Sequence, residues 1–108
     1  MDYTPEQVAR LLDERAIELI DVREPHEWQA GRIPGARHMA LTTLAAQAQT
    51  LTHERPIVFY CRSGGRSAMA ADAFLDAGFD AHNLAGGLLA WRAAGLPLEP
   101  DGGYVAEH

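Results

Sequence analysis

The chain has 108 residues, of which 47% are hydrophobic, so it can build one modest core and is too short for two ordinary domains. Its formal net charge of −6 argues against a nucleic-acid-binding or membrane-binding surface, so any anion site must be local. No apolar run approaches the roughly 18 residues of a membrane span, and the N-terminus lacks a signal-peptide pattern. A lone cysteine cannot form an internal disulfide, so we expect a cytoplasmic protein with a free thiol.

The first third of the chain predicts a helix, a strand, a helical turn and a loop, in that order. A capped helix start at residues 4–7, followed by apolar residues at helical spacing, predicts a helix to about Asp13. The apolar run 18–22 predicts a buried strand, and residues 25–29 predict one helical turn. The stretch 31–35 contains two glycines and a proline, so we expect it to be a loop.

The middle of the chain carries the strongest strand signal. Residues 36–39 predict a short extended piece, and the alanine- and leucine-rich residues 43–51 predict a helix capped by Thr42 or Thr43. Every residue of 56–60 after its proline is apolar or aromatic. This pattern is typical of a central parallel strand that is buried on both faces.

The last third repeats the alternation of helix and strand. We expect a helix over 66–77, a strand over 82–84 and a helix over 87–94, the two helices being stopped by glycines. Strands and helices that alternate along a chain predict an α/β fold with a parallel sheet and helices on both faces.

Residues 1–98 are expected to form a single domain, because no repeat, low-complexity tract or linker interrupts them. The tail 99–108 is rich in turn-forming residues. We expect this tail to be mobile unless Tyr104 and Val105 pack back onto the domain.

The segment 57–67 combines a buried strand, a loop and a helix start, with Cys61 at the bend. Ligands of open α/β sheets bind outside the carboxyl ends of the strands, where Cys61 is placed. Gly64 and Gly65 let the loop turn its N–H groups inward, and the helix adds its positive dipole end. With the neighbouring arginines, these groups are expected to lower the pKa of the Cys61 thiol. A lone cysteine is often an inert core residue, but the loop that follows Cys61 argues against that interpretation.

Three blocks of the sequence resemble, in the same order, the signatures of the rhodanese family. They are LIDVRE (19–24) with Glu27-Trp28 and GRIPGA (31–36), then CRSGGR (61–66), then LAGGLLAW (84–91) with GLP (95–97). The resemblance implies the three-layer rhodanese-like fold, with a central, mostly parallel sheet of about four to five strands and helices on both faces.

The resemblance also implies a sulfurtransferase of the thiosulfate type, in which Cys61 accepts sulfur from thiosulfate or a similar donor. The resulting persulfide passes its sulfur to cyanide or to a thiol, including a protein thiol. Arg62 and Arg66 would neutralise the charge of the donor, and loop N–H groups would hold the terminal sulfur. The implied binding residues are Arg62, Ser63, Gly64, Gly65 and Arg66. No metal or organic cofactor is expected, and the five histidines lack metal-ligand spacing.

Three further residues are expected to support the loop. Asp21 and Arg23 end the first strand and are expected to form an ion pair or hydrogen-bond brace beneath the loop, with direct catalysis as the alternative. Ser67 lies early in the helix that follows the loop. Arg32 stands where the family pattern commonly has histidine, which adds a positive charge.

Two other functions compete with sulfur transfer. A non-catalytic or partner-dependent sulfur-relay module would need the same cysteine, and exposed apolar side chains around the loop would favour such a protein acceptor. The less favoured alternative is a cysteine-dependent phosphatase or an arsenate reductase. Cysteine phosphatases use a Cys-x5-Arg loop to hold a tetrahedral phosphate. The spacing from Cys61 to Arg66 is one residue shorter, and Tyr60 stands where phosphatases usually have histidine. The shorter loop favours a single sulfur atom.

Overall fold

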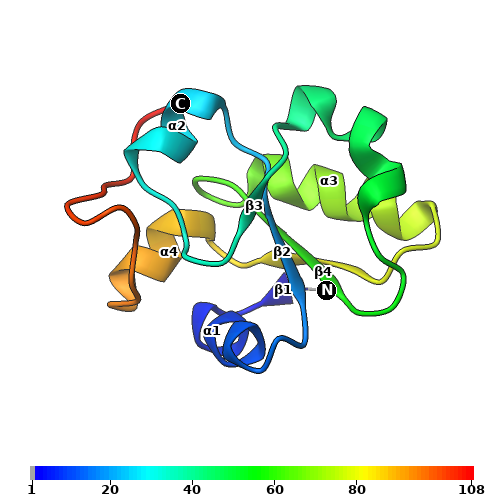
Figure 1. Ribbon diagram of the computed structural model, residues 1–108, viewed down its shortest axis with the longest axis horizontal. Coiled ribbons are helices and arrows are strands. Elements are labelled where there is room, and N and C mark those ends of the chain that lie inside the picture. The colour runs from blue at the N-terminus through cyan, green and yellow to red at the C-terminus, as the bar shows by residue number, and fades with distance from the viewer. Residues whose placement is uncertain (1) are drawn as a thin grey trace.

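The computed structural model describes residues 2–108 and shows one parallel sheet with helices on both faces (Figure 1). The sheet has the strand order β1-β5-β4-β2-β3. Its strands are β1 (Asp2–Tyr3), β2 (Glu18–Asp21), β3 (Arg37–His38), β4 (Ile57–Tyr60) and β5 (Ala81–Leu84). The helices are α1 (Pro5–Asp13), α2 (Pro25–Ala30), α3 (Gly65–Asp76) and α4 (Gly87–Ala93), with 3-10 helices η1 (Leu41–Thr43) and η2 (Ala45–Thr50). Within residues 2–108, no helix has the length and apolar character needed to cross a bilayer.

All four pairings between neighbouring strands are parallel, which confirms the predicted fold class. Strand β4 lies in the middle of the sheet and all its residues are buried, as its continuous apolar sequence predicts. Alternate residues of β4 serve two separate core clusters, because successive side chains of a strand point to opposite faces. Ile57 and Phe59 pack with α3, whereas Val58 and Tyr60 pack with α1 and α4. Cys61 continues this alternation and belongs to the α3 cluster.

Helix α1 begins and ends where the sequence predicts. The Thr4 hydroxyl oxygen accepts a hydrogen bond from the Gln7 N–H, and the Gln7 side chain accepts one from the Thr4 N–H. This capping box satisfies two N–H groups that the first helical turn leaves without partners. The helix then runs to Asp13 and buries Val8 against the sheet.

The prediction of an α-helix over residues 43–51 is wrong, because the structure has two short 3-10 helices there. Neither Thr42 nor Thr43 caps them, and the Thr43 hydroxyl instead donates to the carbonyl of Ala40. Helix propensity contributes less than about 1 kcal/mol per residue, so tertiary packing overrides it easily. Only a leucine near each end of the segment is buried, which leaves no continuous apolar stripe to favour the wider α-helical turn.

The tail returns from α4 to α2, so that the last residues lie beside that helix (Figure 1). Glu99 and Arg32 exchange backbone hydrogen bonds of 2.9 and 2.8 Å in an antiparallel bridge. The N–H of Tyr104 donates to the carbonyl of Ala30 at 2.9 Å, and Val105 packs against the α1–α4 core cluster. In the structure the tail therefore has both backbone and apolar contacts with the domain.

Candidate active site

The sheet topology places Cys61 directly after the central strand, at the carboxyl edge of the sheet. Ligands of open α/β sheets bind at this edge. The connection to α3 is short, since the helix begins at Gly65, one residue earlier than predicted. Gly64 has a φ of +113°, which only glycine adopts without strain, whereas an added Cβ at Gly65 would meet no atom within 4 Å. The tight turn after Cys61 therefore depends on Gly64.

Helix α4 holds the loop from the other side. The N–H groups of Leu88 and Leu89 donate to the carbonyls of Cys61 and Arg62 at 2.8 and 3.0 Å. The preceding Gly87 has a φ of +61°, and a Cβ there would lie 2.5 Å from the Cys61 carbonyl oxygen. The start of α4 thus packs so closely on the loop that only glycine fits.

The Cys61 sulfur lies among hydrogen-bond donors. The residue is 1% exposed, and its Sγ is 3.1 Å from the Gly64 nitrogen and 3.4 Å from the Ser67 hydroxyl oxygen. The buried Ser67 hydroxyl also lies 2.5 Å from Oδ1 of Asn83 on β5. Asn83 is a site residue that the sequence analysis missed, because its neighbours in the sequence suggest only an ordinary strand.

These donors shift the pKa of the Cys61 thiol. Burial disfavours the thiolate and by itself raises the pKa. Hydrogen bonds from the Ser67 hydroxyl and from the N–H groups of Ser67, Gly64 and Ser63 favour the thiolate and outweigh burial. The pKa of Cys61 is therefore lowered from its ordinary value, in the direction that the sequence predicts, by donors of the loop and of the first turn of α3.

Arg66 is held by an acid that the sequence analysis missed. Its guanidinium binds the Glu27 carboxylate in a bidentate pair of 2.8 and 2.9 Å, and Glu27 is completely buried. Burial raises the pKa of Glu27, but the hydrogen bond from Arg66 and other favourable interactions lower it overall. The charge of Arg66 is thus compensated within the protein. The sequence gives little sign of this, since Glu27 looks like an ordinary first-turn glutamate of α2.

Asp21 and Arg23 form the ion pair that the sequence leads us to expect. Both side chains are completely buried, and the closest contact between them is 2.7 Å. Arg23 also donates to the Gly31 carbonyl at 2.7 Å, which ties the end of β2 to the loop after α2. None of the side-chain hydrogen bonds described for residues 2–108 joins either member to Cys61. In this geometry the pair can brace the site without touching the sulfur.

Arg62 has a different environment from the other two arginines. Its side chain is half-buried, and its Nε is buried without a hydrogen-bond partner among residues 2–108. It lines a hollow of about 230 Å³ together with Glu107 and His108 of the tail. Arg62 therefore borders a hollow at the surface, although its Nε itself is buried.

The fold and the site together define a class of protein: a small parallel α/β domain that presents a lowered-pKa cysteine in a loop of N–H donors. The family model described as "Rhodanese-like domain" matches residues 4–94, and the chain belongs to this family. The chain is 34% identical to "Thiosulfate sulfurtransferase GlpE" of Pseudoalteromonas translucida, a match that covers 82% of this chain and 85% of that protein.

Two further comparisons widen the family. The chain is 41% identical to "HTH-type transcriptional regulator Rv0324" of Mycobacterium tuberculosis over 89% of its own length, but spans only 43% of that protein. The fold also matches the solved structure of a rhodanese-related protein from Thermoplasma volcanium, with a TM-score of 0.84 and 23% sequence identity. The match covers 91% of this chain and 96% of the Thermoplasma chain. The domain thus resembles both a stand-alone protein and part of a longer one.

Proposed function

We propose that this protein is a sulfurtransferase that carries sulfane sulfur on Cys61, from thiosulfate or a similar donor to cyanide or a thiol. Membership of the rhodanese-like family and the name of the Pseudoalteromonas relative support sulfur transfer in general. The observation that carries the proposal is the Cys61 sulfur itself, which is buried yet surrounded by donors that favour its thiolate.

The proposed reaction has two displacement steps. The Cys61 thiolate attacks the outer sulfur of thiosulfate, the donor's S–S bond breaks, and sulfite leaves with the electron pair. The product is a persulfide whose terminal sulfur carries one negative charge. An acceptor then attacks that sulfur and the Cys61 thiolate leaves. Both steps balance without a metal or an organic cofactor.

The loop residues have distinct roles in this scheme. The N–H groups of Ser63 and Gly64, with the Ser67 hydroxyl, stabilise the thiolate and then the persulfide. Gly65 opens α3, so its N–H belongs to the unpaired first turn of the helix. Arg62 attracts the anionic donor through the positive charge of its half-buried guanidinium.

The remaining charged residues support the loop. Arg66 shapes its end through Glu27, while Asp21 and Arg23 keep β2 and the following loop in place. We propose that they act on the reaction by positioning the loop.

A thiol on a partner protein is the acceptor that the surface favours in the cell. Leu89, whose N–H bonds to the Arg62 carbonyl, is 37% exposed, and Met69 in the second turn of α3 is 67% exposed. The exposed Leu89 beside the loop suits contact with another protein more than with a small anion. A free thiol on Cys61 also suits a reducing compartment, and we propose the cytoplasm.

Steady-state kinetics test the proposal. Thiocyanate should form from thiosulfate and cyanide with the wild-type protein and should not form with Cys61→Ser. A phosphate monoester such as p-nitrophenyl phosphate serves as the competing substrate, because the loop is one residue shorter than that of cysteine phosphatases. Faster hydrolysis of the phosphate ester than turnover of thiosulfate would contradict the proposal.

A further inference from the structure

A hollow lined by three arginines lies at the amino edge of the sheet, opposite the carboxyl edge that carries Cys61. Its volume is about 430 Å³, and it lies between the end of α1 and the starts of β2 and β3. We call it the arginine hollow, and its charged lining is Arg15, Arg37, Arg55, Asp13 and Glu18. The whole chain has nine basic residues against fifteen acidic ones. A lining of three arginines and two acids is therefore locally positive on an acidic protein.

Two of these arginines share a single carboxylate. One oxygen of Glu18 accepts a hydrogen bond from Arg37 and the other accepts one from Arg55, while the Glu18 side chain is only 11% exposed. Each arginine uses one nitrogen for this contact, and both side chains are almost half exposed. A guanidinium has five N–H donors, so both arginines keep donors for a further acceptor. One of the two positive charges has no counter-charge in the pair.

Arg15 holds the third guanidinium from a strained backbone position. It has a φ of 55° and is the only non-glycine residue with a positive φ within 2–108. Its N–H and that of Ala16 donate to the carbonyls of Leu12 and Leu11, a pattern that ends helices through a left-handed residue, usually glycine. None of the ion pairs described for these residues involves Arg15. The helix end by itself favours glycine, so the strain points to a role for the arginine side chain.

A second hollow with apolar walls adjoins the arginine hollow. Its volume is about 200 Å³, and Leu12, Asp13 and Pro34 line both hollows. The rest of this apolar hollow is lined by Ala9, Trp91, Leu96 and Pro97. Guanidinium groups beside an apolar surface suit a ligand that carries an anionic group on an apolar body.

We propose that the two hollows form a binding site for small amphipathic anions. The arginines bind a carboxylate or a phosphate group, because the N–H fork of a guanidinium matches both. The apolar hollow takes the apolar body of the ligand, and Asp13, where the hollows meet, weakens the binding by repulsion. This site is separate from the Cys61 loop, so the proposal does not depend on sulfur transfer.

The first experiment uses phenyl phosphate and phenylacetate, which each place one anionic group on an aromatic ring. In ¹H–¹⁵N NMR titrations, the Gly35 N–H reports on the arginine hollow and the Trp91 Nε1–H on the apolar hollow, while the Gly64 N–H reports on the Cys61 loop. At least one probe should shift the Gly35 and Trp91 signals, and the tighter probe identifies the preferred anionic group. Benzyl alcohol and inorganic phosphate should each bind more weakly by at least about threefold. No shift up to about 10 mM of either probe, or a shift of Gly64 alone, would overturn the proposal.

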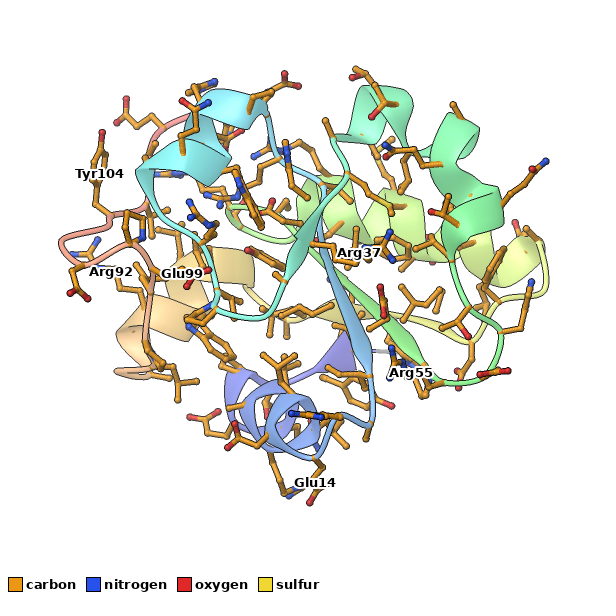
Figure 2. All side chains as sticks on the ribbon, in the orientation of Figure 1. Glu14, Arg37, Arg55, Arg92, Glu99 and Tyr104 are labelled. Atoms are coloured by element: carbon orange, nitrogen blue, oxygen red, sulfur yellow. The ribbon has the colours of Figure 1, made fainter. Side chains whose placement is uncertain are left out.

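Charge variants assign the binding to the named side chains. Arg15→Gln and Arg37→Gln should each raise the Kd by about threefold to tenfold, and Asp13→Asn should lower it. The matched control is Arg92→Gln, because Arg92 lines neither hollow and lies apart from Arg37 and Arg55 in Figure 2. An unchanged Kd in Arg15→Gln, or an equal rise in the control, would contradict the proposal.

Arg15→Gly separates a loss of binding from a loss of folding. Glycine adopts the φ of this position without strain, so the variant should have a Tm at least as high as that of the wild type. Its Kd should nevertheless rise as in Arg15→Gln, while thiocyanate formation should stay at the wild-type rate. If the wild-type protein forms no thiocyanate, the proposed function fails, and the NMR titration still tests this site. A stable Arg15→Gly protein that keeps the wild-type Kd would remove Arg15 from the site and contradict the proposal.

Discussion

The two edges of the sheet use the same residue types in opposite ways. At the amino edge, Glu18 binds Arg37 and Arg55, whose side chains are 47% and 45% exposed. Figure 2 shows both arginines apart from the tail residues Glu99 and Tyr104. Solvent screens such pairs, so each contributes at most about 1 kcal/mol.

At the carboxyl edge, the acids are completely buried. Asp21 binds a fully buried Arg23, and Glu27 binds Arg66 at the end of the Cys61 loop. Removing one member of a buried pair leaves an uncompensated charge in a medium of low polarity. The comparison teaches that burial, more than residue type, decides which ion pairs support the site.

Asp21→Ala should have the largest effect, because it leaves the buried Arg23 guanidinium without its partner. We expect a loss of about 3–5 kcal/mol in the free energy of unfolding, with sulfur transfer falling in parallel. Urea denaturation measures the loss, and Glu18→Ala at the other edge, which removes two ion pairs, should cost no more than about 2 kcal/mol. A stable but inactive Asp21→Ala protein would instead assign the residue a direct role in catalysis.

Gly87→Ala should have the second largest effect on stability. Alanine at this position would have a strained φ, and its Cβ would collide with the carbonyls of the loop. We expect a cost of about 2–4 kcal/mol together with slower reaction of Cys61. Gly95→Ala is the matched control, since Gly95 has a φ of +76° but no atom within 4 Å of an added Cβ. Equal costs for the two variants would show that α4 does not hold the loop by close packing.

Glu27→Gln should cost about 1–3 kcal/mol at neutral pH, because Arg66 loses its charged partner. The pKa of Glu27 is lowered on folding, so its contribution is present above the ordinary glutamate pKa and is lost as the pH falls through the folded-state value. The difference in unfolding free energy between wild type and variant should therefore shrink as the pH is lowered from 6 to 3. A constant difference for Glu27→Gln over this pH range would contradict the assignment.

Ser67→Ala should have a modest effect on stability, because it removes the hydroxyl bonded to the buried Asn83, and a clear effect on the thiol. Without the hydroxyl, the pKa of Cys61 should rise towards its ordinary value, because one hydrogen bond to the thiolate is lost. Alkylation by iodoacetamide should slow by about tenfold at acidic pH and match the wild type at high pH, where both thiols are ionised. A pH profile identical to that of the wild type would show that Ser67 does not stabilise the thiolate.

Local signals predicted much of the fold. The capping residues of α1, the apolar run of β4 and the alternation of elements were sufficient, because each depends on residues close together in the chain. The segment 43–51 was not predicted correctly, since its 3-10 geometry follows from which of its residues reach the core.

The site residues also fall into two groups, those that local sequence predicts and those that only the fold brings together. Cys61 and Gly64 lie in one loop, and the sequence predicts both their position and the direction of the thiol pKa shift. Glu27 and Asn83 come from α2 and β5, and only the folded sheet brings them to Arg66 and Ser67. The pairing of Arg66 with Glu27 is why the loop is less basic than its sequence suggests.

The mass of the intact protein after incubation with thiosulfate tests the central proposal most directly. The wild-type protein should gain one sulfur atom, about 32 Da, and lose it on addition of cyanide. Cys61→Ser should gain nothing. A wild-type protein without the adduct, or an adduct that persists in Cys61→Ser, would contradict a persulfide on Cys61.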